Sequence, residues 1–386
     1  MSSCNSGEDG DSFGDEYGGC KGSVITKESW QYSYKNSILN VESLSKHIPL
    51  STEKKVLLKK VAQRYHMRIS SYYLSLINDV RRENDPIRRQ CIPSEEELYQ
   101  GDQESLDPLE EERTSPFPCL VHRYPDRVLL LVTSRCFMYC RHCTRKRLWR
   151  NESFVPSLDL IGKAINYIRN NPQIREVIVS GGDPLTLSTE RLDQILSLLA
   201  NLKNIEVIRI GTRTPVVLPQ RIDKHLCSIL KKYTNLWMNV QFNHPREITP
   251  LSELACRELQ QCGIPLSNQS VLLRGINDNL RTMKELCQKL QKIRVRPYYL
   301  FQCDPVVGVR HFRTSALKGT EIIKKMRGYT SGMCIPNFVI DGIGGRGKIP
   351  LMPEHLIAKK KNCLILKDYK GEIFAYPEPQ EWNSKD

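Results

Sequence analysis

From residue 128 onward, short apolar runs alternate with longer stretches in which apolar residues recur at helical spacing. Six short apolar runs are typical of buried strands and cover residues 128–132, 176–180, 205–211, 236–242, 266–272 and 295–302. Stretches with helical spacing lie between them, at residues 157–171, 188–202, 219–232, 250–262 and 280–293. Strands that alternate with helices predict an α/β fold with a parallel sheet, either open or closed into a barrel. Six strands are too few for a full eight-stranded barrel, and the side chains that follow the strands should meet at one end.

The N-terminal part of the chain has a different pattern. Residues 1–25 are acidic and rich in Gly and Ser, which predicts a disordered tail. From residue 28 to about 84, apolar residues recur at threes and fours, as in Trp30, Tyr34, Ile38 and Val41, and predict several helices. Residues 85–118 are rich in Pro, Glu and Asp and predict an extended linker. We therefore expect a tail (1–25), an N-terminal helical region with its linker (26–118), a barrel core (119–335) and a short C-terminal α+β segment (336–386).

Composition narrows the functional class. The chain has 386 residues, 14 cysteines and a formal net charge of +14. Scattered cysteines fit a reducing cytoplasm with metal-binding thiols, and no run reaches the roughly 18 apolar residues of a membrane span. The N-terminus does not have the basic and then apolar pattern of a signal peptide. The positive charge would suit RNA, but basic residues are spread along the whole chain, so we expect neither a nucleic acid nor a membrane as partner.

One loop carries three closely spaced cysteines. Cys136, Cys140 and Cys143 follow the first barrel strand as C-x3-C-x2-C. Thiolates at that spacing can hold one metal centre. A zinc site with His142 as the fourth ligand and plain buried cysteines are the alternatives. Three thiolates leave one iron of a [4Fe–4S] cluster open for a ligand. With the aromatic residue Tyr139 before the second cysteine, the loop resembles the radical S-adenosylmethionine (SAM) superfamily.

Two glycine-rich turns stand elsewhere in the chain. The turn at 180–183, S-G-G-D, closes the second strand, where glycine lets a ligand approach the backbone, although a plain turn would have the same sequence. Near the C-terminus, Lys348 stands in D-G-I-G-G-R-G-K-I-P. A lysine amine can form a Schiff base with an aldehyde cofactor such as pyridoxal phosphate (PLP). A phosphate-binding loop is the alternative, but Ile349 stands where such a loop needs Ser or Thr.

Ordered motifs along the chain resemble the lysine 2,3-aminomutase family of the radical SAM superfamily, over about residues 30–379. They are H-R-Y-P-D-R-V-L (122–129), C-R-H-C-T-R (140–145), S-G-G-D-P-L (180–185), I-G-T-R-T-P-V-V-L-P-Q-R-I (210–222), F-N-H-P (242–245), H-F-R-T (311–314), R-G-Y-T-S-G (327–332) and G-K-I-P-L-M-P (347–353). The resemblance implies a partial (β/α)6 radical SAM barrel. It also implies an isomerase that moves the α-amino group of L-lysine to Cβ, giving β-lysine.

The resemblance further implies three cofactors: a [4Fe–4S] cluster, SAM and PLP. The three loop cysteines would hold the cluster, and Lys348 would form the Schiff base with PLP. Arg123 and Tyr124 would contact the PLP phosphate and ring. Contacts with SAM would come from the turn after the second strand, at Ser180, Gly181, Gly182 and Asp183. In this family a 5′-deoxyadenosyl radical removes a β-hydrogen, and nitrogen migrates through a three-membered ring stabilised by the PLP ring.

Substrate recognition would depend on three charged residues, again by resemblance. Arg145 would bind the substrate carboxylate, a role that suits a planar bidentate donor. Asp304 and Asp341 would bind the side-chain ammonium of lysine. The structural alternatives are a surface arginine and two turn aspartates. Other functional hypotheses are an aminomutase on another amino acid, one that supplies β-lysine for translation-factor modification, and a radical SAM enzyme that modifies RNA.

One departure from the family concerns zinc. Clostridial-type members carry a C-terminal cysteine cluster that supplies an intersubunit zinc site, whereas this chain has no cysteine after Cys363. The segment I-N-D-N at 276–279 also has Asn where those members carry a zinc cysteine. We therefore predict no structural zinc. We still expect a homo-oligomer, and a reducing electron donor such as flavodoxin or ferredoxin.

Overall fold

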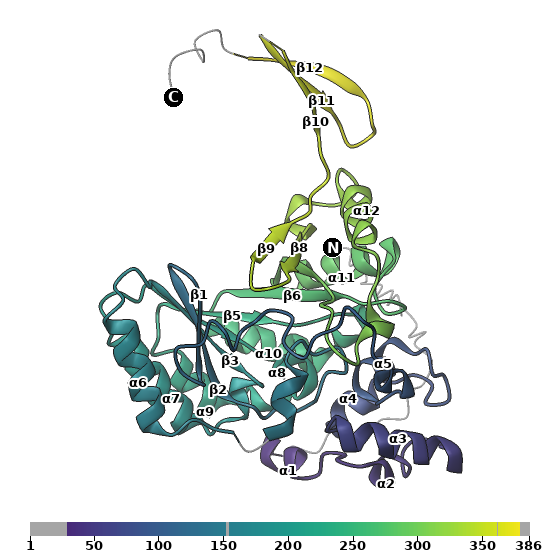
Figure 1. The fold of residues 1–386 in the computed structure, drawn as a ribbon, viewed down its shortest axis with the longest axis vertical. Helices are drawn as coiled ribbons and strands as arrows, with labels where there is room; N and C mark the ends of the chain where they lie inside the picture. The colour runs from purple at the N-terminus through teal and green to yellow at the C-terminus, as the bar shows by residue number, and fades with distance from the viewer. Residues whose placement is uncertain (1–28, 152–153, 361, 379–386) are drawn as a thin grey trace, which may run out of the picture.

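A nine-stranded sheet forms the centre of the molecule (Figure 1). The computed structural model describes residues 29–151, 154–360 and 362–378, so the predicted tail at 1–25 lies outside the described residues. Each strand pairs with the next one along the chain. The strands are β1 (Leu120–Tyr124), β2 (Arg127–Thr133), β3 (Glu176–Gly181), β4 (Val207–Gly211), β5 (Leu236–Val240), β6 (Leu266–Leu272), β7 (Arg296–Gln302), β8 (Asn337–Gly342) and β9 (Gly347–Pro350). Strands β2 to β8 are parallel, and β1 and β9 are antiparallel edges.

The predicted fold class is confirmed, and the six predicted strands correspond to β2 to β7. The sheet has one more parallel strand, β8, which we had assigned to the C-terminal segment. It pairs with β7 from Tyr299↔Asn337 to Phe301↔Val339. Helix α12 (Ala316–Met326) supplies the crossover, and its Gly319 lies so close to the Phe338 ring that a Cβ atom would come within 2.2 Å of it. A βαβ unit therefore extends the barrel beyond the six strands that the sequence pattern predicted.

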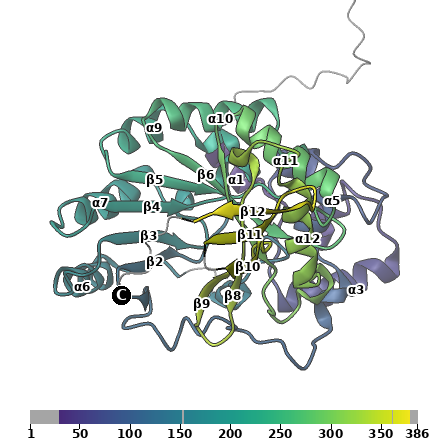
Figure 2. The ribbon, with the colours of Figure 1, turned by 90° about the horizontal axis from the view of Figure 1, so that it is seen from above.

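Amphipathic helices cover the outer face of the sheet (Figure 2). They are α6 (Leu158–Arg169), α7 (Thr189–Ala200), α9 (Lys224–Leu230), α10 (Pro250–Gln261), α11 (Leu280–Lys292) and α12. In α6, Ile161, Ile165 and Ile168 recur at helical spacing and are buried in the core. Ser157 and Ser188 cap α6 and α7, with Oγ accepting from the backbone 3.2 Å away. Apolar spacing and caps thus explain how each crossover helix packs on the sheet.

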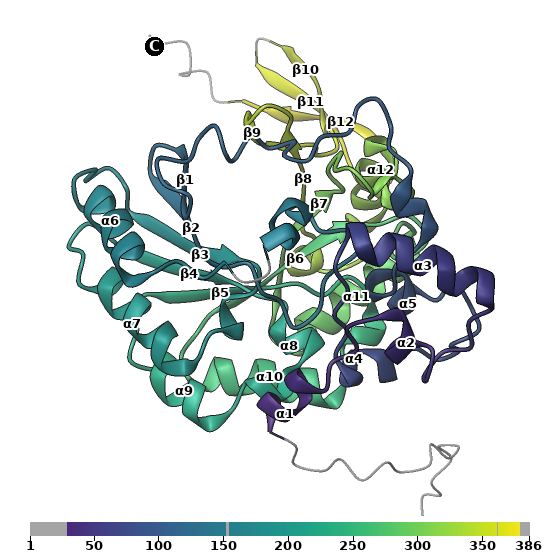
Figure 3. The same ribbon diagram turned by 60° about the horizontal axis from the view of Figure 1, so that its bottom comes forward.

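The N-terminal region is helical as expected. It contains α1 (Trp30–Lys35), α2 (Val41–Leu44), α3 (Thr52–Arg64) and α4 (Ser71–Ser75). The expectation of an extended linker after it is wrong in part, because α5 (Pro86–Cys91) and the short 3₁₀ helix η1 (Glu95–Leu98) lie within it. Glu97 in η1 is fully buried and pairs with two cations of the cysteine loop, Arg141 and Lys146. Figure 3 shows α2 to α5 together on the side of the barrel away from α6 and α7.

The two edges of the barrel face each other without strand pairing in the described residues. One hydrogen bond joins them: the backbone N–H of Lys348 in β9 donates to Oη of Tyr124 in β1, 2.9 Å away. Beyond β9 the chain forms a separate antiparallel sheet of β10 (Leu356–Lys360), β11 (Cys363–Lys367) and β12 (Ile373–Pro377), which projects from the body in Figure 1. None of the described helices is long and apolar enough to span a bilayer.

Candidate active site

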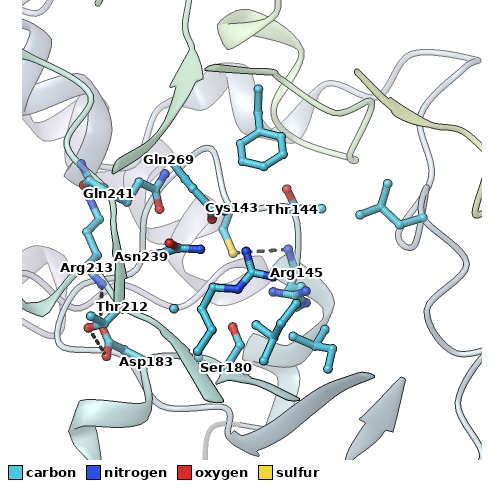
Figure 4. Close-up of a pocket in the computed structure, with 18 of the residues that line it drawn as sticks. Cys143, Thr144, Arg145, Ser180, Asp183, Thr212, Arg213, Asn239, Gln241 and Gln269 are labelled. Carbon is cyan, nitrogen blue, oxygen red and sulfur yellow. Dashed lines mark hydrogen bonds between the residues drawn. The ribbon is translucent and has the colours of Figure 1, made fainter. Parts of the chain in front are cut away.

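A cavity of about 710 Å³ occupies the barrel interior. Every residue that we predicted to belong to the site lines this one cavity. These residues are Arg123, Tyr124, Cys136, Cys140, Cys143, Arg145, Ser180, Gly181, Gly182, Asp183, Asp304, Asp341 and Lys348. They come from strand ends and loops spread over more than 220 positions of the chain, since Arg123 and Lys348 are at its two extremes. Figure 4 shows several of them pointing into the same space.

The cysteine loop begins where β2 ends and is held by its own buried aromatic residues. Phe137 and Tyr139 are each 1% exposed. The backbone N–H of Tyr139 donates to the carbonyl of Arg68, and that of Arg141 donates to the carbonyl of Gln90, at 3.1 and 2.9 Å. The N-terminal helical region thus anchors the loop from outside, while the three sulfurs remain on the cavity side.

Two of the three sulfurs accept hydrogen bonds. Sγ of Cys143 accepts from the backbone N–H of Arg145 at 3.3 Å, and Sγ of Cys140 accepts from Nη1 of Arg213 at 2.8 Å. Burial raises the pKa of the Cys136 thiol, so without a metal this cysteine is neutral. Metal binding would deprotonate it. This donor set fits an iron–sulfur cluster.

No three His, Cys, Asp or Glu side chains within the described ranges approach closely enough to hold a single metal ion. A cluster places each thiolate on a different iron, so it accommodates wider spacing than a mononuclear zinc site. His142, the alternative fourth zinc ligand, has Nε2 hydrogen-bonded with the side-chain amides of Gln241 and Asn243, at 3.3 and 3.2 Å.

The turn after β3 packs directly on the start of the cysteine loop. A Cβ atom on Gly181 would lie 2.2 Å from the carbonyl oxygen of Thr133, and one on Gly182 would lie 2.2 Å from that of Arg135. Gly181 also has φ +126°, which side chains rarely adopt. The backbone N–H of Gly182 donates to the Thr133 oxygen at 2.6 Å. Glycine is therefore required here because two backbone segments touch, whether or not a ligand also approaches.

Asp183 is a positioning residue in this structure. Its carboxylate accepts from Oγ1 of Thr212 at 2.7 and 2.9 Å, and from the backbone N–H of Arg213 at 2.8 Å and of Leu185 at 3.1 Å. Burial raises its pKa even so. The carboxylate thus ties the end of β3 to the segment after β4, while Ser180, Gly181 and Gly182 line the cavity.

Lys348, Asp341 and Asp304 lie together at the β7–β8–β9 side of the cavity. Nζ of Lys348 donates to Oδ1 of Asp341 at 3.1 Å, as the strand register Asp341↔Lys348 allows. Oδ2 of Asp304 accepts from Oγ1 of Thr144 at 2.8 Å. Burial, and then the negative charge of Asp341, raise the pKa of Asp304 to about 7. The two carboxylates thus interact and together form an acidic pocket.

Arg145 is held by a residue that we did not predict, Glu111. Nε of Arg145 donates to Oε2 of Glu111 at 2.9 Å, and Nη2 donates to Oε1 at 2.6 Å, which is a bidentate pair. Burial opposes ionisation of Glu111, but Arg145 and Arg147 outweigh it and hold the pKa near 2. The sequence shows three consecutive glutamates at 110–112 in the expected linker. It does not indicate that one of them pairs with Arg145.

Arg123 has an unused donor that fits a phosphate. Its Nη2 donates to the carbonyl of Leu109 at 2.6 Å, while its Nε is buried and has no partner. Arg123 lines the same cavity as Lys348. A buried N–H without a partner costs about 1–3 kcal/mol, and a phosphate oxygen would satisfy it. With the Lys348 amine nearby, these residues fit PLP.

Polar side chains within or just after other strands also line the cavity, and we had assigned them no role. They are the amides of Asn239, Gln241 and Gln269, and the guanidinium of Arg213, which are labelled in Figure 4. Arg213 had appeared only within the motif at 210–222. The amides were missed because the sequence does not show which face of the sheet a polar residue in a strand occupies until the strand register is known.

The chain is similar to proteins of known families. Residues 130–287 match the model described as "Radical SAM superfamily", and residues 323–386 match the model described as "Lysine-2,3-aminomutase". The chain is 51% identical to L-lysine 2,3-aminomutase of Clostridium subterminale, over 91% of this chain and 84% of that protein. It is 45% identical to glutamate 2,3-aminomutase of Clostridioides difficile, over 90% of this chain and 83% of that protein.

A solved structure also resembles the chain, although more distantly. It is that of Streptococcus suis SuiB bound to S-adenosylmethionine, with a TM-score of 0.43 and 14% identity, over 58% of this chain and 51% of that chain.

The family matches also indicate the cofactors. Membership of the radical SAM superfamily implies a [4Fe–4S] cluster and SAM, and lysine 2,3-aminomutases use PLP. With about half of its residues identical to such enzymes over nine-tenths of its length, this chain belongs to the lysine 2,3-aminomutase family of radical SAM isomerases.

Proposed function

We propose that this protein moves the α-amino group of L-lysine to Cβ, with PLP bound at Lys348 and a SAM-derived radical as the hydrogen acceptor. The observation that carries the substrate assignment is the acidic pocket formed by Asp304 and Asp341 beside Lys348. Relatives in this family are named as aminomutases of lysine or of glutamate. These two candidate substrates differ in the charge at the distal end of the side chain.

The acidic pocket favours an ammonium over a carboxylate. Asp304 is partly buried and Asp341 is 8% exposed, so a ligand charge placed between them is only weakly screened by water. The ammonium of lysine would stabilise both carboxylates in their charged form. The distal carboxylate of glutamate would be a third negative charge in the same pocket, which is unfavourable by several kcal/mol. The electrostatics of the pocket therefore support lysine.

Arg145 would hold the α-carboxylate of the substrate. Glu111 occupies Nε and Nη2 of its guanidinium, which leaves Nη1 for the substrate. Because Glu111 is itself fixed by Nη2 of Arg147 at 2.8 Å, the guanidinium is oriented before the substrate arrives. The substrate would be held at both ends, by Arg145 and by the acidic pocket, with its β-carbon between them.

The remaining residues would hold the cofactors. Cluster, SAM and PLP together supply hydrogen abstraction at Cβ and delocalisation of the unpaired electron while nitrogen migrates. Cys136, Cys140 and Cys143 would ligate the cluster, and Arg123 and Tyr124 would position PLP near Lys348. The backbone of 180–182 would face the SAM amino group. Enclosure in the barrel would keep a reactive radical from water and from other side chains.

Steady-state kinetics on the reconstituted enzyme test the substrate assignment. We expect kcat/KM for L-lysine to exceed that for L-glutamate. Asp304→Asn and Asp341→Asn should each lower kcat/KM for lysine by the equivalent of about 2–5 kcal/mol, as for a broken buried ion pair. Asp368→Asn in the turn between β11 and β12, outside the cavity, is the control and should behave as wild type. A wild-type preference for glutamate would contradict the assignment.

We also propose a homo-oligomer and an external one-electron reductant. The sheet of β10 to β12 supports the oligomer, because Leu356, Phe374 and Tyr376 are 43–53% exposed on it. Flavodoxin or ferredoxin would suit the reductant. The cytoplasm is the compartment where both the scattered free cysteines and such donors are expected.

A further inference from the structure

We propose that Arg213 sets the reduction potential of the iron–sulfur cluster through its hydrogen bond to the sulfur of Cys140; this role rests on the proposed ligation of the cluster by that cysteine. Nη1 of Arg213 lies 2.8 Å from Sγ. Arg213 follows β4 and Cys140 lies in the loop after β2, so the contact crosses the carboxyl end of the sheet. It places a permanent positive charge directly on one of the three sulfurs.

The position of this guanidinium does not depend on the sulfur. Nε of Arg213 donates to the carbonyl of Gln241 at 3.2 Å. Nη2 donates to Oε1 of Gln90 at 2.6 Å and to Oε1 of Glu247 at 2.8 Å. Arg213 is 6% exposed, and Gln90 and Glu247 are fully buried. Because three partners hold the side chain, iron bound to Cys140 would meet a guanidinium that is already in place.

The counter-charge of Glu247 is directed away from the sulfur. Its Oε2 accepts from the backbone N–H of Asn243 at 2.5 Å and of His244 at 3.0 Å. Its Oε1, besides Arg213, accepts from Oη of Tyr73 at 2.6 Å. The carboxylate charge is therefore shared with donors behind the guanidinium. Toward the cluster, the ion pair presents its positive end in a buried site where charges are weakly screened.

The consequence for the cluster follows from its charge. One electron from an external reductant of the flavodoxin or ferredoxin class converts [4Fe–4S]²⁺ to [4Fe–4S]⁺, and no bond or proton changes at Arg213. Hydrogen bonds to cluster sulfurs and nearby positive charge stabilise the more negative, reduced form. Arg213 therefore raises the midpoint potential. It eases electron entry before the cluster passes an electron to SAM.

A redox titration of the anaerobically reconstituted full chain, followed by electron paramagnetic resonance without SAM, PLP or lysine, tests this inference. Arg213→Gln should lower the equilibrium constant for reduction about tenfold, which is about 59 mV for a one-electron couple. Arg213→Lys keeps the charge and should restore part of the loss. Arg221→Gln is the matched control, since Arg221 is also fully buried but donates only to Leu185, Leu187 and Thr189. Its potential should equal that of wild type.

A second variant guards against misfolding. Arg213→Gln alone leaves Glu247 buried without its cation, which is strongly destabilising. Arg213→Gln combined with Glu247→Gln removes both charges and should assemble the cluster with the same lowered potential. A wild-type potential in either Gln variant with full iron content overturns the inference. The inference is also overturned if neither Arg213→Gln nor the double variant binds iron, because Arg213 would then be needed only for folding. The iron content of Cys140→Ala tests separately whether Cys140 ligates the cluster. Neither measurement depends on the turnover of lysine.

Discussion

At the scale of single residues, three buried glutamates around the barrel each neutralise the cations that shape the cavity. Glu97 pairs with Arg141 and Lys146. Glu111 pairs with Arg145 and Arg147, and Glu247 with Arg213. A buried ion pair contributes little net stability, but loss of one partner is costly. These pairs therefore act mainly to fix the geometry of the cysteine loop and of the substrate arginine.

The amine of Lys348 should carry the PLP. It is the lysine that lines the cavity, with Nζ 3.1 Å from Asp341 and 5.1 Å from the centre of the Phe301 ring. We expect borohydride reduction of the holoprotein to fix the cofactor on Lys348, as shown by peptide mapping. Lys348→Ala should retain weak PLP binding through phosphate contacts but lose turnover. A label on another lysine would refute the assignment, and Lys163→Ala on the exposed face of α6 is the control, which should be labelled on Lys348 as wild type is.

The pH profile should report the acidic pocket. The pKa of Asp304 is raised to about 7, first by burial and then by Asp341. Below that pH the carboxyl group is protonated and cannot pair with an ammonium. We therefore expect kcat/KM for lysine to fall about tenfold per pH unit below pH 7 and to level off above it. Asp341→Asn removes the like charge and should move this limb to lower pH. If kcat/KM of Asp304→Asn fell below pH 7 in the same way, the fall could not come from protonation of Asp304.

At the scale of elements, the cysteine loop depends on two others. From outside, carbonyls of the N-terminal helical region accept from the backbone of Tyr139 and Arg141. From the sheet side, the turn after β3 touches the loop backbone at Thr133 and Arg135. The loop has little secondary structure of its own, so these contacts determine where its sulfurs lie.

Substitution of Gly182 should therefore disturb the cluster rather than the barrel. In Gly182→Ala the new Cβ would lie 2.2 Å from the carbonyl oxygen of Arg135, and backbone cannot move as easily as a side chain. We expect a loss of about 1–3 kcal/mol in stability, and a lower iron content after reconstitution. Gly162→Ala in α6 is the matched control, because nothing lies within 4 Å of its new Cβ. It should bind iron as wild type does and be slightly more stable.

At the scale of the whole molecule, the barrel is completed on its open side by loops. Oη of Tyr124 bridges β1 to β9, and the backbone N–H of Gly344 donates to the carbonyl of Pro108 at 3.1 Å. The expected linker thus supports the turn that carries Lys348. The sheet of β10 to β12 lies beyond this closure. Cross-strand pairs Leu366↔Phe374 and Leu364↔Tyr376 place apolar side chains on one of its faces.

That apolar face should form the contact between subunits. A three-stranded sheet with an uncovered apolar face gains stability only when the face is buried. Phe374→Ser with Tyr376→Ser should therefore lower the mass of the oligomer in light scattering. Ala375→Ser on the opposite face is the control and should leave the mass unchanged. An unchanged mass in the double variant would show that subunits, if they associate, do so elsewhere.

The sequence by itself determined the alternating strands and helices, the cysteine loop, the lysine turn and the family. These features depend on local information: apolar periodicity is set by the geometry of strand and helix, and a motif needs only residues a few positions apart. The predicted site residues that follow β2, β3 and β7 line the cavity because strand ends of a parallel sheet meet at one edge, whereas Arg123, Tyr124 and Lys348 reach it from the antiparallel edge strands β1 and β9. The seventh parallel strand, β8, was missed because its last residues, Asp341 and Gly342, belong to the glycine-rich segment that we had assigned as a turn.

Only the tertiary structure decided which charges meet. Glu111 reaches Arg145 from 34 positions away, and Arg213 reaches Cys140 from 73. Residues 85–118 were expected to be a linker because their composition is polar, yet two of their glutamates are buried. A polar side chain can be buried when a partner forms hydrogen bonds or an ion pair with it. The fold determines which residue is that partner, and the neighbouring sequence does not. The ion pairs that orient the site were therefore invisible until the barrel brought distant segments together.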